Sequence, residues 1–337
     1  MKYKKLIFAL ALTLAVLTVP ALAAEAEELV PVGITVGIEL NCRGVVVTGY
    51  SEVETGSGVR CPAREAGLLP GDAIVAVNGV SVSGGGEFLE KTAELAGEPL
   101  RLRAVRDRQE LEFTVTPAEN TEGHYQLGLW LRDSVHGIGT VTFYDPATGA
   151  WGALGHGVSL QGGAELLDIS GGCITAAGVE DVVPGRKGEP GELRGVPDAD
   201  RVLGAVEANT AQGIFGSAAE PLSAAAPLPV ASDSEIRTGK ARIVATVDEG
   251  GPREFDAEIV RVDLSAADAR QLTISVTDPE LLSATGGIVQ GMSGSPVVQN
   301  GKLVGAVTHV LLSDPSKGYA VSMENMLSAL TEASAAA

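Results

Sequence analysis

Aromatic residues and positive charge are both scarce in this sequence. Phe, Trp and Tyr make up 4% of the 337 residues, while hydrophobic residues as a whole make up 45%, so we expect cores of Val, Leu, Ile and Ala. Lys and Arg number 24 against 43 Asp and Glu, a formal net charge of −19. Nucleic-acid binding requires basic residues that replace phosphate counterions, so the charge balance argues against that partner. Attraction to anionic lipid is equally disfavoured outside the N-terminus.

Cysteine and histidine are too few for two common kinds of site. Cys42, Cys61 and Cys173 are an odd number, which excludes a full disulfide framework. We expect buried free thiols, although a Cys42–Cys61 bridge within one domain stays open. The four histidines are scattered and form no His-Glu-x-x-His motif, which argues against a zinc site. We therefore expect neither a metal nor a cofactor.

The chain has one long apolar run, and it lies at the N-terminus. Residues 2–5 carry three lysines, residues 6–19 are apolar, and Ala21-Leu22-Ala23 matches a small-x-small cleavage site. This order is typical of a signal peptide, and an uncleaved membrane anchor is the alternative. Residues 1–24 are therefore predicted to direct export of the rest of the chain across the cytoplasmic membrane.

Glycine, in contrast, is abundant. The 43 glycines indicate many turns and favour a mostly β fold. The polar residues 118–124 are predicted to be a linker, and short strands separated by turn formers follow from residue 125. No repeat of 20 to 50 residues is visible. Residues 125–330 are therefore expected to form a barrel or sandwich domain.

Residues 30–117 are predicted to be a separate α+β domain. The stretch CPAREAGLLPGDAIVAVNGV, residues 61–80, resembles the corresponding part of PDZ domains, and its Asn78-Gly79 pair is typical of a type I′ turn. The resemblance places a carboxylate-binding loop at residues 35–38. It implies that the backbone amides of Val36, Gly37 and Ile38 receive a peptide, terminal or internal, that adds as a strand.

The stretch GMSGSP, residues 291–296, places a serine between two glycines. A serine hydroxyl attacks a carbonyl only when a base removes its proton, and the resulting oxyanion needs amide donors fixed in advance. The amides of Gly291 and Ser293 are predicted to be those donors. An ordinary glycine-serine turn is the alternative.

The surroundings of Ser293 resemble the Gly-Asp-Ser-Gly-Gly-Pro region of trypsin-like proteases, with departures at Met292 and Ser295. The two apolar segments that follow, joined by an Asn-Gly pair, match the strands that follow this motif in that group. His156 in GALGHGVSL is predicted to be the base, because it gives the order His then Ser. His309 follows the second apolar segment and could line the substrate cleft.

A closer resemblance covers nearly the whole chain. The blocks RDSVHGIGTVTFYDP, GALGH, KGEPGE, GIFG, SVTDPELLSATGGIVQGMSGSP and NGKLVGAVTHVLLSDPSKGYAV are similar to those of the SpoIVB peptidase family. The resemblance implies a trypsin-like double β-barrel with a catalytic triad of His156, Asp278 and Ser293. The residues alone leave the acid open, and Asp168 is the alternative to Asp278.

The same resemblance implies a biological role. It points to an exported serine endopeptidase that cleaves a regulatory membrane protein, and itself, during sporulation signalling in the space around the forespore. The PDZ domain would control substrate recognition. A catalytically silent exported PDZ adaptor is the alternative, whereas the absence of a Gly-x-Ser-x-Gly elbow argues against an esterase.

Overall fold

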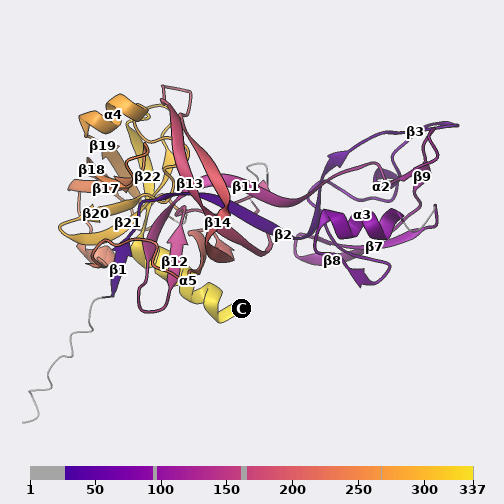
Figure 1. The fold of residues 1–337 in the computed structure, drawn as a ribbon, viewed down its shortest axis with the longest axis horizontal. Coiled ribbons are helices and arrows are strands. Elements are labelled where there is room, and N and C mark those ends of the chain that lie inside the picture. The colour runs from indigo at the N-terminus through magenta and orange to yellow at the C-terminus, as the bar shows by residue number, and fades with distance from the viewer. Residues whose placement is uncertain (1–26, 94–96, 161–164, 267, 337) are drawn as a thin grey trace, which may run out of the picture.

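The computed structural model describes residues 27–93, 97–160, 165–266 and 268–336. Two β-barrels lie together at one end and a smaller unit lies at the other, joined by two long strands (Figure 1). The predicted signal peptide or anchor, residues 1–24, lies outside the described residues. Among the helices within the described ranges, none combines the length and the apolar character needed to cross a membrane.

The first barrel is a ring of six antiparallel strands, with two short strands attached to its edge. Trp151 and Ile174 are fully buried in its core, among mostly aliphatic neighbours. In ring order the strands are β2 (Thr35–Tyr50), β11 (Leu129–Tyr144), β12 (Ala150–Ala153), β15 (Gly213–Ser217), β14 (Glu192–Thr210) and β13 (Ile169–Val183). Outside the ring, β1 (Glu28–Pro31) pairs with β11, and β16 (Leu228–Pro229) pairs with β1.

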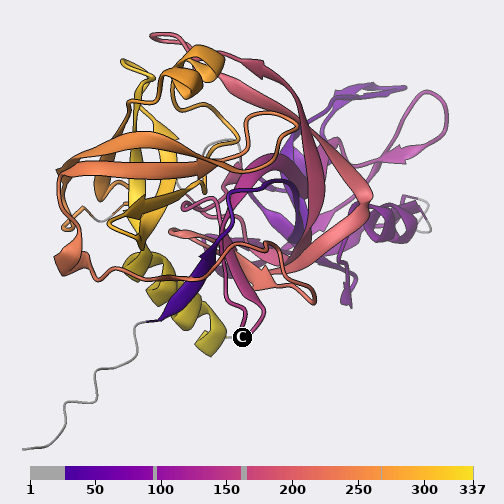
Figure 2. The same ribbon diagram turned by 60° about the vertical axis from the view of Figure 1, so that its left-hand side comes forward.

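The second barrel is also a closed ring of six strands. Met326 of the C-terminal helix is buried together with Phe215 of the first barrel and Leu303 of the second, so this helix packs against both barrels (Figure 2). The ring order is β17 (Gly239–Ala245), β18 (Arg253–Val262), β19 (Leu272–Val276), β22 (Lys317–Ser322), β21 (Lys302–Val310) and β20 (Pro296–Gln299); the helical elements are η2 (Asp233–Glu235), α4 (Pro279–Thr285) and α5 (Met323–Ala336).

The smaller unit contains the segment that resembles a PDZ domain, and we call it the PDZ-like unit. Asn78 and Gly79 have φ values of 50° and 81°, as the predicted type I′ turn requires. Its elements, besides parts of β2 and β11, are β3 (Val53–Thr55), β4 (Gly58–Arg60), α2 (Pro62–Glu65), β5 (Ala73–Val77), β6 (Val80–Ser81), α3 (Gly85–Ala93), β7 (Leu100–Arg106), β8 (Gln109–Val115), β9 (Ala118–Glu119) and β10 (Tyr125–Gln126).

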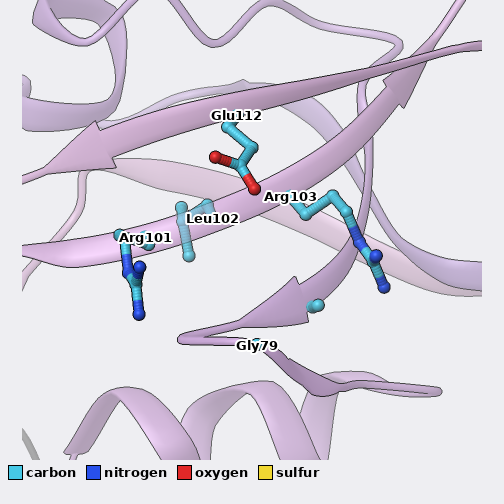
Figure 3. A pocket seen from close by; sticks show the side chains of 6 residues that line it. Gly79, Arg101, Leu102, Arg103 and Glu112 are labelled. Atoms are coloured by element: carbon cyan, nitrogen blue, oxygen red, sulfur yellow. The ribbon is translucent and has the colours of Figure 1, made fainter.

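The PDZ-like unit has its own core and contains a small cavity. Phe88 of α3, Ile74 of β5 and Leu102 of β7 are buried together, which gives this unit a core separate from those of the barrels. A cavity of about 120 Å³ lies over the strands near the β5–β6 turn (Figure 3). Its lining includes Gly79, Arg101 and Glu112. None of the residues that line this cavity belongs to the predicted catalytic set.

The strand β2 overturns one prediction. Val36, Gly37 and Ile38 pair with β11 on one side and with β13 on the other, in the middle of the first barrel. A peptide cannot add as a strand there, because both edges of the backbone are already occupied. The predicted peptide-binding loop at these three residues is therefore wrong.

One continuous strand serves both parts of the molecule. The first half of β2 belongs to the first barrel, and from Val45 onward it pairs with β5 of the PDZ-like unit. Gly44 marks the change, with a φ of 90° and only 2.4 Å between the position of a Cβ there and the carbonyl oxygen of Ile74. The PDZ-like unit is thus inserted between strands of the first barrel, instead of preceding the barrel domain along the chain.

The three cysteines are free thiols. Cys42 and Cys61 are buried, as expected for structural thiols, and Cys173 is half-buried. Burial raises the pKa of Cys42 and also that of Cys173, so both thiols are held in their neutral form.

Candidate active site

The loop from Gly291 to Ser295 contains two backbone amides that have no hydrogen-bond partner among the described residues. The amides of Met292, Gly294 and Ser295 donate to the carbonyl oxygens of Val289, Val307 and Met292. The amides of Gly291 and Ser293 donate no hydrogen bond to any other described residue. Since buried backbone amides are nearly always paired, two free donors on alternate residues are the arrangement that an oxyanion hole requires.

The glycines allow the tight course of this loop. Gly291 and Gly294 have φ values of 93° and 98°, in the left-handed region that favours glycine. A Cβ at Gly294 would lie 1.9 Å from the carbonyl oxygen of Thr140, so no other residue fits there without moving the backbone. The loop brings the half-buried Ser293 hydroxyl to 2.6 Å from the carbonyl oxygen of Thr308, to which it donates.

His156 lies just beyond the end of β12, in a turn that begins with Leu154 and Gly155, both at positive φ. Its Nδ1 lies 2.9 Å from the carbonyl oxygen of Gly157. When Nδ1–H donates to that oxygen, Nε2 is left as the proton acceptor, the tautomer that a general base needs. Burial lowers the pKa of His156, opposed in part by the hydrogen bond to Gly157, so the ring is neutral at neutral pH.

A second imidazole lies beside the first. The ring centroids of His156 and His309 are 4.7 Å apart, with the planes inclined by 32°. His309 belongs to β21 of the second barrel and has one side open to solvent. Burial of its other side, followed by the charges of His156 and Arg270, lowers the pKa of His309 to about 4, against a weaker opposing effect of Asp268.

Ser293 and His156 approach the same segment of β21 from different barrels. The Ser293 hydroxyl bonds to Thr308, and a Cβ at Gly155 would lie 3.0 Å from the Thr308 methyl group. His309, which stacks on His156, follows Thr308 directly. Ser293, with the two predicted oxyanion donors, and His156 thus both lie beside residues 308–309 of β21, while among the described residues no hydrogen bond joins the Ser293 hydroxyl to the His156 ring.

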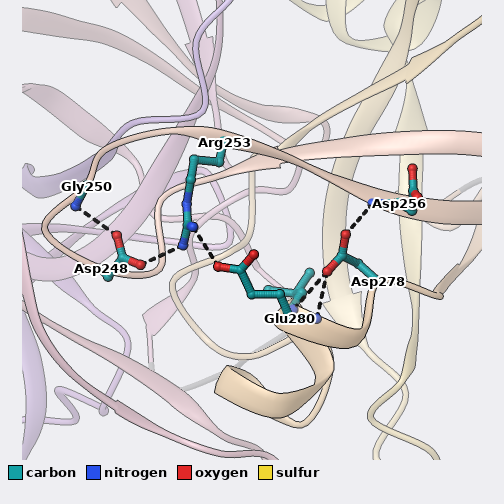
Figure 4. A network of polar contacts seen from close by, with 7 residues as sticks. Asp248, Gly250, Arg253, Asp256, Asp278 and Glu280 are labelled. Atoms are coloured by element: carbon teal, nitrogen blue, oxygen red, sulfur yellow. Dashed lines mark hydrogen bonds and ion pairs between the residues drawn. The ribbon is translucent and has the colours of Figure 1, made fainter.

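The structure gives Asp278 a different role from the predicted one. Its carboxylate caps the N-terminus of α4 and accepts from the amides of Glu280 and Leu281, at 2.9 and 3.1 Å, and from Asp256 at 3.2 Å (Figure 4). Burial works to raise its pKa, but these three amide hydrogen bonds and the Arg253 charge hold the pKa below its usual value. The assignment of Asp278 as the acid that orients His156 is therefore corrected to a helix cap.

The alternative acid, Asp168, is not at the site either. It is exposed and pairs with Arg43 of β2 at 3.1 Å. Within the described part of the chain, no carboxylate hydrogen-bonds to His156, and the Gly157 carbonyl is the group that orients its ring. The described residues likewise include no cluster of three His, Cys, Asp or Glu side chains that could hold a metal ion.

Two residues at this site were not predicted as functional. The Gly157 carbonyl leaves no mark in a sequence, because any residue supplies a backbone oxygen. Thr140 is the other, since its hydroxyl and its amide both bond to the loop of Ser293. Its position in an apolar strand, TVTF, suggests only a β-branched strand residue.

Comparisons with known proteins identify the family of this chain. Residues 123–327 match the family model of the SpoIVB peptidase S55, and residues 55–106 match a PDZ domain. The PDZ domain of an SdrC-like protein from Listeria monocytogenes is 18% identical, with a TM-score of 0.22, and covers 26% of this chain and 87% of that one. Rv3671c from M. tuberculosis H37Rv, as an inactive serine-to-alanine mutant, is 14% identical, with a TM-score of 0.35, over 59% of this chain and 82% of that one. Because the match to the SpoIVB peptidase S55 model spans more than half of this chain, the chain belongs to the SpoIVB peptidase S55 family and is a serine peptidase with a PDZ domain.

Proposed function

We propose that this chain is an endopeptidase of the trypsin-like two-barrel type, with Ser293 as nucleophile and His156 as general base. The observation that carries the proposal is the pair of unbonded amides at Gly291 and Ser293, which flank a serine hydroxyl at the junction of two closed six-stranded rings. A neutral His156 held by a backbone carbonyl beside the same segment supports it.

The reaction follows from these groups. On substrate binding, the Ser293 hydroxyl turns from the Thr308 carbonyl to Nε2 of His156, which takes its proton as the oxygen attacks the peptide carbonyl. The amides of Gly291 and Ser293 hold the oxyanion, and a single donor of this kind is typically worth about 10²–10³ in turnover. His156 then protonates the leaving amine, and water releases the acyl group by the same steps in reverse.

Gly287 bears on which substrate side chain the specificity pocket can accept. It lies six residues before the nucleophile, where trypsin-like enzymes form the floor of the pocket that receives the substrate side chain. A Cβ there would lie 2.0 Å from the carbonyl oxygen of Pro315, so the position is filled by backbone and has no carboxylate. Preference for a basic side chain is therefore not expected from this position.

The biological substrate is proposed to be a regulatory membrane protein, cleaved during sporulation signalling, together with the chain itself. Membership of the SpoIVB peptidase family supports this role. The positively charged start, apolar run and small-residue site of residues 1–24 support export, by which the peptidase would be anchored or secreted into the space around the forespore.

The PDZ domain is proposed to bind an extended peptide, but not at the loop first predicted. Among the described strands, residues 129–133 of β11 pair on one side only, with β2, and α3 lies next to them. The amide of Gly85 at the start of α3 donates to Asp133 at 2.9 Å, and Leu89 of α3 is 64% exposed. A free strand edge beside a helix with an exposed apolar side chain suits a peptide that adds as a strand.

A fluorophosphonate probe, which reacts only with an activated serine, tests the catalytic part. Labelling of the parent and its loss in Ser293→Ala are expected. Ser295→Ala is the matched control, because Ser295 is buried two residues away and its hydroxyl has no hydrogen-bond partner among the described residues. Absence of labelling in the folded parent, or labelling that persists in Ser293→Ala, would refute the proposal.

Mass spectrometry tests the self-cleavage. Fragments that form in the parent but not in Ser293→Ala are expected, and they would also give a first cleavage site. Identical fragment patterns in the two proteins would assign the cleavage to another protease and remove autoproteolysis from the proposal.

A further inference from the structure

Thr140 contacts both residues that supply the oxyanion hole. Its amide donates to the carbonyl oxygen of Ser293 at 2.9 Å, and its hydroxyl donates to the carbonyl oxygen of Gly291 at 2.7 Å. The side chain is 1% exposed. One residue of the first barrel therefore bonds to two carbonyls of a loop that belongs to the second barrel.

These two bonds act on the orientation of the peptide groups. A peptide unit is planar, so a carbonyl that is held in place fixes the amide of the next residue. The two bonds from Thr140 therefore restrain the Gly291–Met292 and Ser293–Gly294 peptide units, which follow the two free amides along the chain. Met292 and Gly294 donate their own amides to Val289 and Val307. The Gly291–Met292 and Ser293–Gly294 peptide units, which follow the two free amides, are thus each hydrogen-bonded through both their carbonyl and their amide.

We infer that Thr140 is a positioning residue for the oxyanion hole, and this inference rests on the proposed role of Gly291 and Ser293. The amide bond of Thr140 is backbone and any residue would make it. The hydroxyl bond to Gly291 depends on the side chain, and only Thr or Ser supplies it at this position. Without it, the buried Gly291 carbonyl loses its partner, and the Gly291–Met292 peptide unit is held at one end only, by the bond from the Met292 amide to Val289.

The strand that carries Thr140 also forms part of the PDZ-like unit. Thr140 lies on β11, seven residues after Asp133, and β11 runs from the PDZ-like unit to the first barrel (Figure 1). At its start, β11 pairs on one side only among the described strands. The strand that is proposed to receive a peptide is therefore the same strand that holds the oxyanion loop.

The experiment compares labelling kinetics by the fluorophosphonate probe in three variants. Thr140→Val keeps the shape and the backbone amide but removes the hydroxyl, and we expect the maximal labelling rate to fall about 10–100-fold with the concentration for half-maximal rate unchanged. Thr140→Ser restores the hydroxyl and should recover most of the rate. A residue that served only stability would change the melting temperature without this selective loss of the maximal rate.

Thr142→Val is the matched control, because Thr142 lies two residues further along β11, is fully buried, and its hydroxyl has no partner among the described residues. It should label like the parent. A folded Thr140→Val that labels at the parental rate overturns the inference. If Thr140→Val does not fold, Thr140→Ser decides, since a folded serine variant that labels as slowly as an oxyanion-deficient enzyme also overturns it. Failure of the proposed function is distinguishable, because then the parent itself does not label.

Discussion

The imidazole rings of His156 and His309 stack across the junction of the two barrels, with centroids 4.7 Å apart. Each ring comes from a different barrel, His156 from the turn after β12 and His309 from β21. Two protonated imidazoles at this distance repel each other, and burial disfavours the charge on each. Both pKa values lie below the ordinary value for histidine, and that of His309 is lowered to about 4.

This arrangement predicts how far the pH must be lowered before kcat/KM falls. The base must be neutral to accept the Ser293 proton, and a lowered pKa of His156 keeps it neutral at mildly acidic pH. Activity is expected to be flat around neutral pH and to fall only well below pH 6.5, the ordinary value. The pH dependence of kcat/KM on fluorescent casein measures this. An acid limb at or above pH 6.5 would contradict the assignment of a buried His156 as base.

The helix-capping role of Asp278 predicts that its charge is dispensable for catalysis. Asn caps helices about as well as Asp, so Asp278→Asn should keep kcat within about tenfold of the parent. Loss of the triad acid would instead lower kcat by roughly 10⁴. Asp278→Ala removes the cap and should cost about 0.5–2 kcal/mol of unfolding free energy, measured by denaturant titration. An Asp278→Asn variant that folds normally but has lost activity would restore the triad role.

Much of the nucleophile loop could be predicted from sequence, because its geometry depends on near neighbours. Gly291, Ser293 and Gly294 follow each other within one turn, and glycine at positive φ is a local requirement. Asp278 was misassigned although a local signal was present. An Asp followed by Pro279 and Glu280 is typical of a helix start, with its cap, a proline at the first position and an acidic first turn.

The misplaced peptide loop has another cause. The 16 residues of β2 form one strand with no break in composition, so the sequence does not reveal that its first half pairs within a barrel. Which neighbours a strand acquires depends on segments more than 90 residues away in β11 and β13. Only Gly44, at the point where the strand passes from the barrel to the PDZ-like unit, marks the boundary.

The free edge of β11 predicts a selective effect of α3. Leu89→Glu places a charge beside this edge, where burial of an apolar side chain would be worth about 1.5–3 kcal/mol. We expect KM for a protein substrate to rise about tenfold or more, with the rate of fluorophosphonate labelling unchanged. Val59→Glu is the control, since Val59 is similarly exposed but lies on β4. Equal effects of the two variants would argue against docking at this edge.

The crowding at Gly294 predicts a loss of catalysis that backbone strain alone would not cause. Gly294 and Gly301 both have positive φ, at 98° and 73°, but a Cβ at Gly301 would meet open space, whereas one at Gly294 would lie 1.9 Å from the Thr140 carbonyl oxygen. Alanine at either position should cost about 1–2 kcal/mol through the backbone conformation, measured by denaturant titration. Gly294→Ala must also displace the loop from Thr140. Because a displacement of catalytic groups by about 1 Å can cost about 10²-fold in rate, we expect the labelling rate of Gly294→Ala to fall by about that factor. Gly301→Ala should label like the parent. Equal labelling of the two variants would mean that contact between this loop and Thr140 does not set the geometry at Ser293.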